Sequence, residues 1–180
     1  MHLKFWHILG FFFTVIVGTL LHFTYEWSGE NPIVALVSPV NESTWEHLKL
    51  LFIPMLFFAI IEYFAYGKQI PNFIPIKVIS MIIGMTTIVI VFYTYTLITG
   101  ENYLIADIAT FMLGVFLSYL FSYFFLQTDV FSSQLANRIA WIILLLILFS
   151  FFYFTYYPPK YELFLDPNTG TYGALNDSYQ

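Results

Sequence analysis

The stretch LLFIPMLFFAIIEYFAY, residues 50–66, decides the fold class, because it is a long apolar run with a single charged side chain. A helix that crosses a bilayer needs roughly 20 mostly apolar residues, and this run reaches that length when it is extended back to Thr44. Other runs of similar length and composition lie before and after it. The sequence therefore predicts an all-α integral membrane bundle of five transmembrane helices. We expect the spans at about residues 5–27, 44–66, 77–99, 103–127 and 139–157.

The composition supports a membrane protein and excludes several partners. Hydrophobic residues make up 59% of the chain and charged residues 9%, whereas charged residues are about a quarter of a soluble domain. The chain has only six Lys and Arg, no two adjacent, and a net charge of −5. Nucleic acids and anionic lipid headgroups require clustered basic residues, so the lipid bilayer is the expected partner and nucleic acid is not. The absence of cysteine excludes disulfides and thiolate metal ligands.

The positions of the basic residues predict the orientation in the cell membrane. Lys and Arg concentrate before the first run and in the loops after the second and fourth runs, a pattern typical of the cytoplasmic side. We expect a cytoplasmic N-terminus, a first run that is a retained helix and not a signal peptide, and an exterior C-terminus. The chain then divides into a transmembrane domain, residues 1–157, and an exterior tail, residues 158–180. The basic residues behind this prediction are Lys4, Lys68, Lys77 and Arg138.

One apolar segment is too short to span. NPIVALVSPV, residues 31–40, holds only a few apolar residues between two prolines. Such a length suits a re-entrant or interfacial segment, or an ordinary outer loop. We expect this segment to lie directly after the first helix, at the entrance of the second.

The sequence NESTWEHLK, residues 41–49, opens the second span with an unusual density of polar side chains. Ser43 and Glu46 have the spacing of a capping box, in which each side chain binds a free backbone N–H. Lys49 can stack over Trp45 or extend to the headgroups. Helix capping does not explain the remaining polar residues of this stretch. These are Asn41, Glu42 and His47.

A second polar cluster is expected at the same membrane face. His22 and Glu26 stand at i and i+4, so they share one face of the first helix, and His22 lies more than a turn inside the span. Asp107 lies about one turn inside the fourth span. Polar side chains at such depth normally face the bundle interior or water. The candidate ligand-binding or acid/base residues are therefore His22, Glu26, Asn41, Glu42, Glu46, His47 and Asp107.

These residues permit three classes of function. In the first, the pocket binds or translocates a cation, a proton or a small amine. In the second, the protein is a metal-dependent, hydrolase-like enzyme that acts on a lipid or isoprenoid-type substrate, with a divalent metal such as zinc as cofactor. In the third, the polar cluster only joins helices of an accessory subunit. The candidate metal ligands are His22, His47, Glu26 and Glu46.

The C-terminal tail contains both turn formers and apolar side chains. In LFLDPNTGTYG, residues 163–173, Asp166 to Asn168 is suited to an Asx-type turn, and Phe164 and Tyr172 offer apolar anchors. We expect the tail to fold over the mouth of the bundle.

Two further expectations concern packing. Glu62 lies one turn from the end of its helix and can extend outward to pair with Lys68. Ser118 and Ser122 have the spacing of small residues that seat a neighbouring helix closely.

The motifs LHFTYEWSG, PVNESTWEHLKLLFIP and LFLDPNTGTYG resemble a family of small bacterial multi-pass membrane proteins that is known only as a domain of unknown function. The resemblance covers essentially the whole chain. It implies the fold and a membrane location and supplies no activity.

Overall fold

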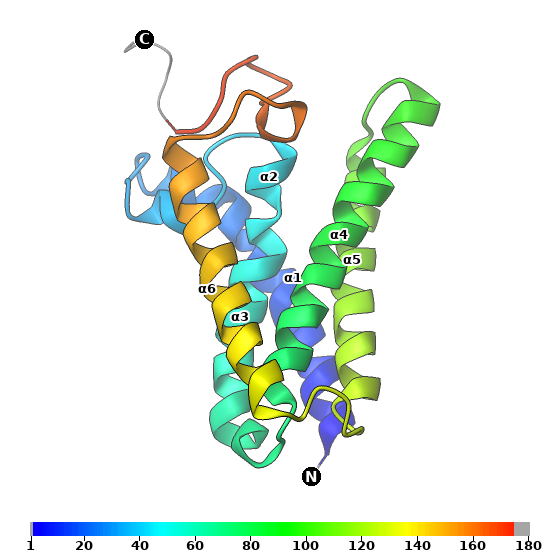
Figure 1. The fold of residues 1–180 in the computed structure, drawn as a ribbon. Helices are drawn as coiled ribbons and strands as arrows, with labels where there is room; N and C mark the ends of the chain where they lie inside the picture. Colours follow the sequence, from blue (N-terminus) through cyan, green and yellow to red (C-terminus); the bar gives the residue numbers. More distant parts are fainter. Residues whose placement is uncertain (1, 175–180) are drawn as a thin grey trace.

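The structure is a computed structural model that describes residues 2–174. Within these residues, five segments are long and apolar enough to cross a membrane, which confirms the predicted fold class (Figure 1). The second of them consists of a short helix and a long helix that follow each other directly. The helices are α1 (Leu3–Trp27), α2 (Thr44–His47), α3 (Lys49–Ala65), α4 (Phe73–Thr99), α5 (Leu104–Phe125) and α6 (Gln134–Tyr156). Short 3₁₀ helices, η1 (Val34–Leu36), η2 (Gly67–Gln69) and η3 (Glu162–Phe164), lie in the connections.

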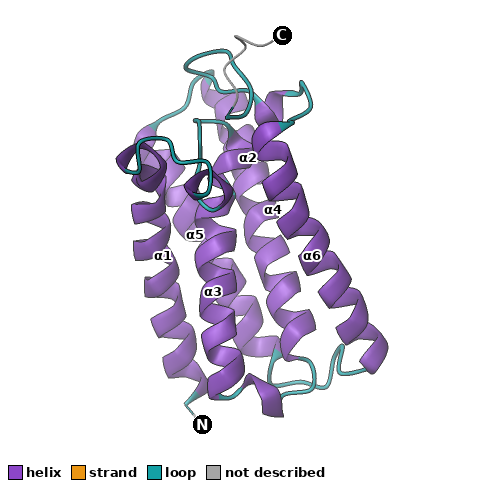
Figure 2. Cartoon of the chain, turned by 90° about the vertical axis from the view of Figure 1, so that its left-hand side faces the viewer, coloured by secondary structure: helices purple, strands orange, loops and turns teal. Residues whose placement is uncertain are grey.

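Apolar side chains cover the outside of the bundle as well as its core. On α1, Phe12 and Ile16 are 56% and 57% exposed, while α3 buries Leu51 and Phe52 completely. Helices that are apolar on every side fit a lipid environment, because exposure of their apolar outer faces to water would be unfavourable. The α3 span is the most enclosed of the five, and it packs mainly against α1 and α4 (Figure 2).

Two helices begin earlier than the sequence pattern indicates. The α6 helix begins at Gln134 because the Ser133 side chain accepts a hydrogen bond from the backbone N–H of Ala136 at 3.1 Å. The α4 helix begins at Phe73 and holds Pro75 in its first turn, where the missing N–H has no helical partner to lose. Both extensions are polar or proline-containing, so an apolar-run criterion omits them.

A proline and a glycine together allow α1 to approach α3 closely. Pro54 lies inside α3 and has no N–H, so the carbonyl of Leu50 lacks its helical donor. Gly18 of α1 faces this carbonyl, and a Cβ at position 18 would lie 2.4 Å from the Leu50 oxygen. Any larger residue at position 18 would therefore push the two helices apart.

The crossing of α4 and α5 also depends on small residues. A Cβ added to Gly84 would lie 2.9 Å from the Gly114 carbonyl oxygen, and a Cβ added to Gly114 would lie 2.9 Å from the Gly84 oxygen. Ser118 belongs to the same contact, and its hydroxyl donates to the Gly114 carbonyl. The predicted close packing at Ser118 is thus confirmed, whereas the Ser122 hydroxyl instead hydrogen-bonds the buried His7 ring at 3.0 Å.

The helices alternate in direction, which brings several distant segments to one end of the bundle. The C-terminal ends of α1, α4 and α6 and the N-terminal ends of α2 and α5 lie at this end, together with the tail (Figure 1). We call it the tail end. The segment 31–40 also lies here, where η1 packs against α6 and α1 and Ala35 is fully buried. The Tyr156 hydroxyl ties α6 to this segment by donating to the Pro32 carbonyl.

The tail packs on the bundle through aromatic contacts and a turn. The Phe164 ring lies 4.9 Å from the Trp45 ring and 5.4 Å from the Phe154 ring. The Asp166 carboxylate accepts from the backbone N–H of Asn168 at 2.8 Å, which confirms the Asx-type turn. Residues 175–180, the last part of the predicted tail segment, lie outside the described residues.

Candidate metal site at the tail end

Two histidines and one carboxylate converge at the tail end. His22 comes from α1, His47 from α2, and Glu42 from the loop that precedes α2. One Glu42 oxygen lies 3.4 Å from His47 Nε2 and 4.0 Å from His22 Nε2, and one ligand atom from each residue lies within 4.8 Å of the others. The two imidazole rings meet edge to face with centroids 5.0 Å apart. The side chains of all three are partly exposed, so the group is open to solvent.

The local backbone orients the His47 ring. Its Nδ1–H donates to the Ser43 carbonyl at 2.9 Å, so Nε2 is the nitrogen that faces Glu42. A backbone carbonyl on one imidazole nitrogen fixes the tautomer and leaves the other nitrogen free as a ligand, an arrangement typical of metal-binding histidines. Ser43 keeps this carbonyl in place because it caps the α2 helix and accepts from Glu46 N.

The two histidines also influence the Glu42 carboxyl. When His47 is protonated, the hydrogen bond from its Nε2–H lowers the pKa of Glu42 below its ordinary value, and the positive charges of His47 and His22 act in the same direction. Partial burial opposes the shift without reversing it. Glu42 is therefore an ionised carboxylate at neutral pH, which is the form that binds a cation.

One pair of side chains in this group has the ligand spacing of a zinc-type ion. Zinc binds imidazole nitrogen and carboxylate oxygen at about 2.0–2.2 Å, so two ligands of a tetrahedral ion stand about 3.3 Å apart. The pair formed by His47 and Glu42 already has that separation at 3.4 Å, while His22 must approach by a side-chain rotation. Nitrogen and oxygen donors of this kind suit zinc and similar divalent transition metals.

Two of the carboxylates expected as metal ligands lie elsewhere. Glu26 is exposed on the last turns of α1 and is not in the convergent group. Glu46 is 2% exposed and is paired with Lys49 at 2.5 Å. Glu42 thus takes the place in the group that the sequence pattern assigns to Glu26 and Glu46.

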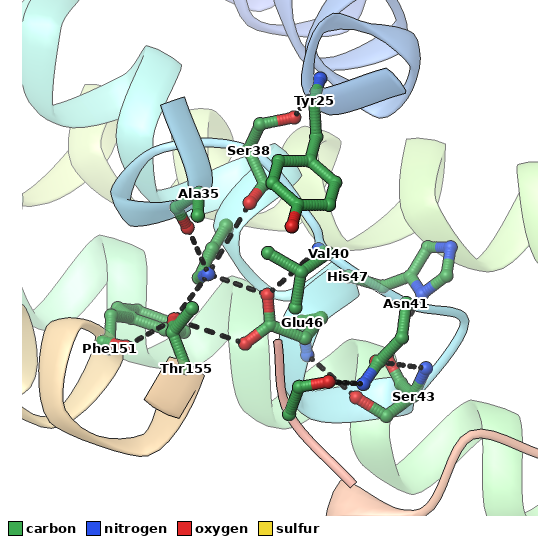
Figure 3. Close-up of polar contacts among 12 residues, drawn as sticks. Tyr25, Ala35, Ser38, Val40, Asn41, Ser43, Glu46, His47, Phe151 and Thr155 are labelled. Carbon is green, nitrogen blue, oxygen red and sulfur yellow. Dashed lines mark hydrogen bonds and ion pairs between the residues drawn. The ribbon is translucent and has the colours of Figure 1, made fainter. Parts of the chain in front are cut away.

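The Glu46 carboxylate is the centre of a buried network (Figure 3). One oxygen accepts from Lys49 Nζ and from the backbone N–H of Val40, and the other accepts from the Thr155 hydroxyl of α6 at 3.3 Å. Lys49 is completely buried, and its Nζ also donates to Thr155 and to the Ala35 carbonyl. This network joins α2, α3, α6 and the segment 31–40.

Two expectations for this stretch are therefore wrong. Lys49 neither stacks on Trp45 nor extends to the headgroups, because its ammonium group has a complete set of buried partners. Only half of the capping box forms, since the Ser43 N–H is bound by the Asn41 side chain at 3.0 Å and not by Glu46. Asn41 also donates to the Gly173 carbonyl and so links the helix start to the tail.

Asp107 lines a cavity that two residues of the candidate metal site also line. Its carboxylate accepts from the Tyr95 hydroxyl of α4, and this hydrogen bond ties the ends of α4 and α5 together. Asp107, Glu42 and His47 all line the same cavity of about 360 Å³ at the tail end. His22 is not among its lining residues, so only the Glu42 and His47 part of the candidate metal site borders the cavity.

A second buried ion pair lies toward the opposite end of the bundle. Glu62 of α3 is paired with Lys77 of α4 at 2.5 Å and accepts from the Tyr66 hydroxyl. The expected pair with Lys68 is wrong, because Glu62 faces inward and is fully buried, while Lys68 lies over the Phe64 ring. A carboxylate at this depth pairs inside the protein because lipid offers it no solvation.

The spacing of residues along the chain indicates one of the two buried ion pairs but not the other. Lys49 stands at i+3 from Glu46, so one helix face already offers this carboxylate a partner. No comparable signal connects Glu62 with Lys77, because their contact depends on how α3 packs against α4. Glu42 likewise reaches His22 only through the fold of the loop between α1 and α2.

The five spans and the partly exposed His/Glu group define a multi-pass membrane protein with a candidate ligand site at one end. The chain belongs to a family of unknown function, DUF6512, whose model matches residues 1–174. No curated protein and no solved structure matches the chain.

Proposed function

We propose that this membrane protein binds a divalent metal ion such as zinc through His22, Glu42 and His47. The convergence of two imidazole nitrogens on one carboxylate oxygen carries the proposal. The backbone hydrogen bond that orients His47 supports it, because it presents Nε2 to the same point as Glu42. Uptake or translocation of the cation begins with the same binding step.

The number of ligands favours an open coordination position. Three protein ligands leave the fourth position of a tetrahedral zinc ion to water or to a bound molecule. Glu42 and His47 border the cavity, so this position has access to it. Binding of the metal needs neutral imidazoles and an ionised carboxylate, and affinity falls with decreasing pH as protons compete for the histidines.

Metal analysis of purified protein tests the proposal. Wild-type protein loaded with zinc and then passed over a desalting column is expected to retain about one zinc per chain, in line with one three-ligand site. His22→Ala and His47→Ala are each expected to lose it. His2→Ala, a change of an exposed histidine far from the group, serves as the matched control and should keep the zinc. Zinc retained by both test variants, or absent from the wild type, would contradict the proposal.

A metal-dependent hydrolase is the second candidate, and the open position beside a cavity favours it. A hydrolytic zinc activates the water in that position. Cobalt-substituted protein offers a test, because its visible spectrum changes when an added ligand such as acetohydroxamate occupies an open position. An unchanged spectrum would argue for a closed site and against hydrolysis.

The accessory-subunit alternative predicts a different pattern. If the group only joined α1 to α2, His22→Ala and His47→Ala would lower the thermal stability of protein treated with a chelator, and zinc would have no effect on any variant. A zinc-dependent rise of the melting temperature in the wild type alone separates metal binding from this alternative.

A further inference from the structure

The cavity beside the candidate metal site is amphipathic. It extends from the tail end to Ile88, near the middle of α4. Its inner part is apolar, and its outer part carries carboxylates. We call Leu50, Ile88, Phe92 and Phe111 the apolar wall, and Glu42, Asp107 and Glu162 the acidic rim.

Contacts between different elements fix the shape of this cavity. The glycines of α4 and α5 hold the two helices together below it, and the hydrogen bond from Tyr95 to Asp107 holds them at the rim. The tail forms another side through Leu165 and Asn168. Figure 1 shows the upper ends of α4 and α5 leaning away from α2, with the tail above. The apolar wall therefore comes from three different candidate spans, α3, α4 and α5.

The charge of the lining selects the head group of a ligand. All three charged side chains of the acidic rim are carboxylates, and no Lys or Arg is among the described residues that line the cavity. A carboxylate or phosphate head group would meet three like charges, with His47 as the one side chain of the described lining that can become cationic, whereas an ammonium group would find complementary charge and hydrogen-bond acceptors. A neutral hydroxyl head group could donate a hydrogen bond to the rim but would gain no attraction between opposite charges.

The volume selects the apolar part of the ligand. At about 360 Å³ the cavity is near the lower limit of small-molecule sites, so it accommodates one hydrocarbon chain and not a two-chain lipid. We propose that the cavity binds a single-chain amphiphile with a primary-amine head group, which places the ammonium at the acidic rim and the chain along the apolar wall. This inference goes beyond metal binding, because it depends on the cavity lining and requires no metal.

Native mass spectrometry of the full chain in phosphatidylcholine nanodiscs tests this ligand class. Dodecylamine, dodecanol and dodecanoate share one chain length and differ in head-group charge. In buffer with EDTA, the wild type is expected to bind dodecylamine at least about tenfold more tightly than dodecanol, and dodecanoate least. The presence of EDTA makes the result independent of whether zinc binds at the neighbouring group.

Two variants show where the amphiphile binds. Thr96→Trp fills the cavity and should weaken dodecylamine binding about tenfold or more, whereas Leu97→Trp on the 86% exposed neighbouring position should change it less than about twofold. Asp107→Asn removes a rim charge without adding bulk and should reduce the preference for amine over alcohol. Equal binding of all three amphiphiles, preference for dodecanoate, or equal effects of the two Trp variants would overturn the proposal.

Discussion

The two buried ion pairs of this bundle have the same chemistry and very different surroundings. Glu46 and Lys49 share their charges with a threonine hydroxyl, backbone carbonyls and a backbone N–H. Glu62 and Lys77 lie among aromatic rings, and within residues 2–174 the contacts of Lys77 Nζ are its partner carboxylate and the faces of Phe73 and Tyr119. The comparison teaches that Lys49 belongs to a redundant polar network at the tail end, whereas Lys77 at the opposite end depends on one ion pair among the described residues.

The same comparison explains why the candidate site lies at the tail end. There the Glu46 network satisfies the buried Lys49, and it leaves Glu42, four residues earlier than Glu46, partly exposed between two histidines. At the opposite end Glu62 is bound by Lys77 and Tyr66, and the exposed Asp129 belongs to no such His/Glu group among the described residues. A free acid beside two imidazoles is what separates a candidate site from a purely structural pair.

The largest expected effect comes from Glu62→Gln. It leaves Lys77 buried with no counter-charge, and loss of one partner of a buried pair costs about 3–5 kcal/mol. Reversible unfolding in mixed micelles measures this loss. Glu26→Gln, on an exposed carboxylate of α1, is the control and should change stability by less than about 0.5 kcal/mol. A cost for Glu62→Gln as small as that of the control would show that the pair is not buried as described.

A smaller effect is expected from the matched change Glu46→Gln. Lys49 keeps the Thr155 hydroxyl and the Ala35 carbonyl as acceptors, so the cost should fall to about 1–3 kcal/mol. The comparison between the two Gln variants in one unfolding assay is the decisive quantity. A larger loss for Glu46→Gln than for Glu62→Gln would reverse the distinction between a redundant network and a single contact.

Removal of metal should affect the tail end alone. Zinc at about 100 times its dissociation constant stabilises a binding protein by about 2.7 kcal/mol, so a chelator is expected to lower the melting temperature of the zinc-loaded wild type. His47→Ala should show no response to zinc or chelator. Glu62→Gln, although destabilised, should keep the full zinc response, because its defect lies at the other end. Loss of the response in both variants would indicate a general folding defect.

The smallest effect is a pH dependence of metal-free protein. The histidines lower the pKa of Glu42, so this carboxylate stabilises the fold above its ordinary pKa of about 4.3, and the contribution is lost as the pH falls through the lower folded value. Because the side chain is 43% exposed, the contribution should stay below about 1 kcal/mol. The stability difference between wild type and Glu42→Gln is expected to shrink below pH 4. A stability difference between wild type and Glu42→Gln that grows as the pH falls would contradict the lowered pKa of Glu42.

Much of the fold follows from the sequence, because length and apolar character alone indicate five spans, and the Asx-type turn of the tail is encoded locally by Asp166 and Asn168. The roles of the acids do not follow in the same way. The sequence predicts that Glu62 reaches outward and that Lys49 stacks over Trp45 or reaches the headgroups, but both face inward, and the partner of Glu62 is supplied only by tertiary packing. His22 and His47 were correctly expected at one end, since helix direction sets the end at which a residue lies. Which carboxylate joins them depends on the path of the loop between α1 and α2.

The zinc content of Glu42→Gln, measured beside that of Glu26→Gln, tests the central claim most directly. Each variant removes one carboxylate near His22, a partly exposed one in Glu42→Gln and an exposed one in Glu26→Gln. Only Glu42 lies within reach of both imidazoles. We predict that Glu26→Gln retains about one zinc per chain and that Glu42→Gln retains none. Zinc kept by Glu42→Gln, or lost from Glu26→Gln while its fold is intact, would contradict the assignment of the site.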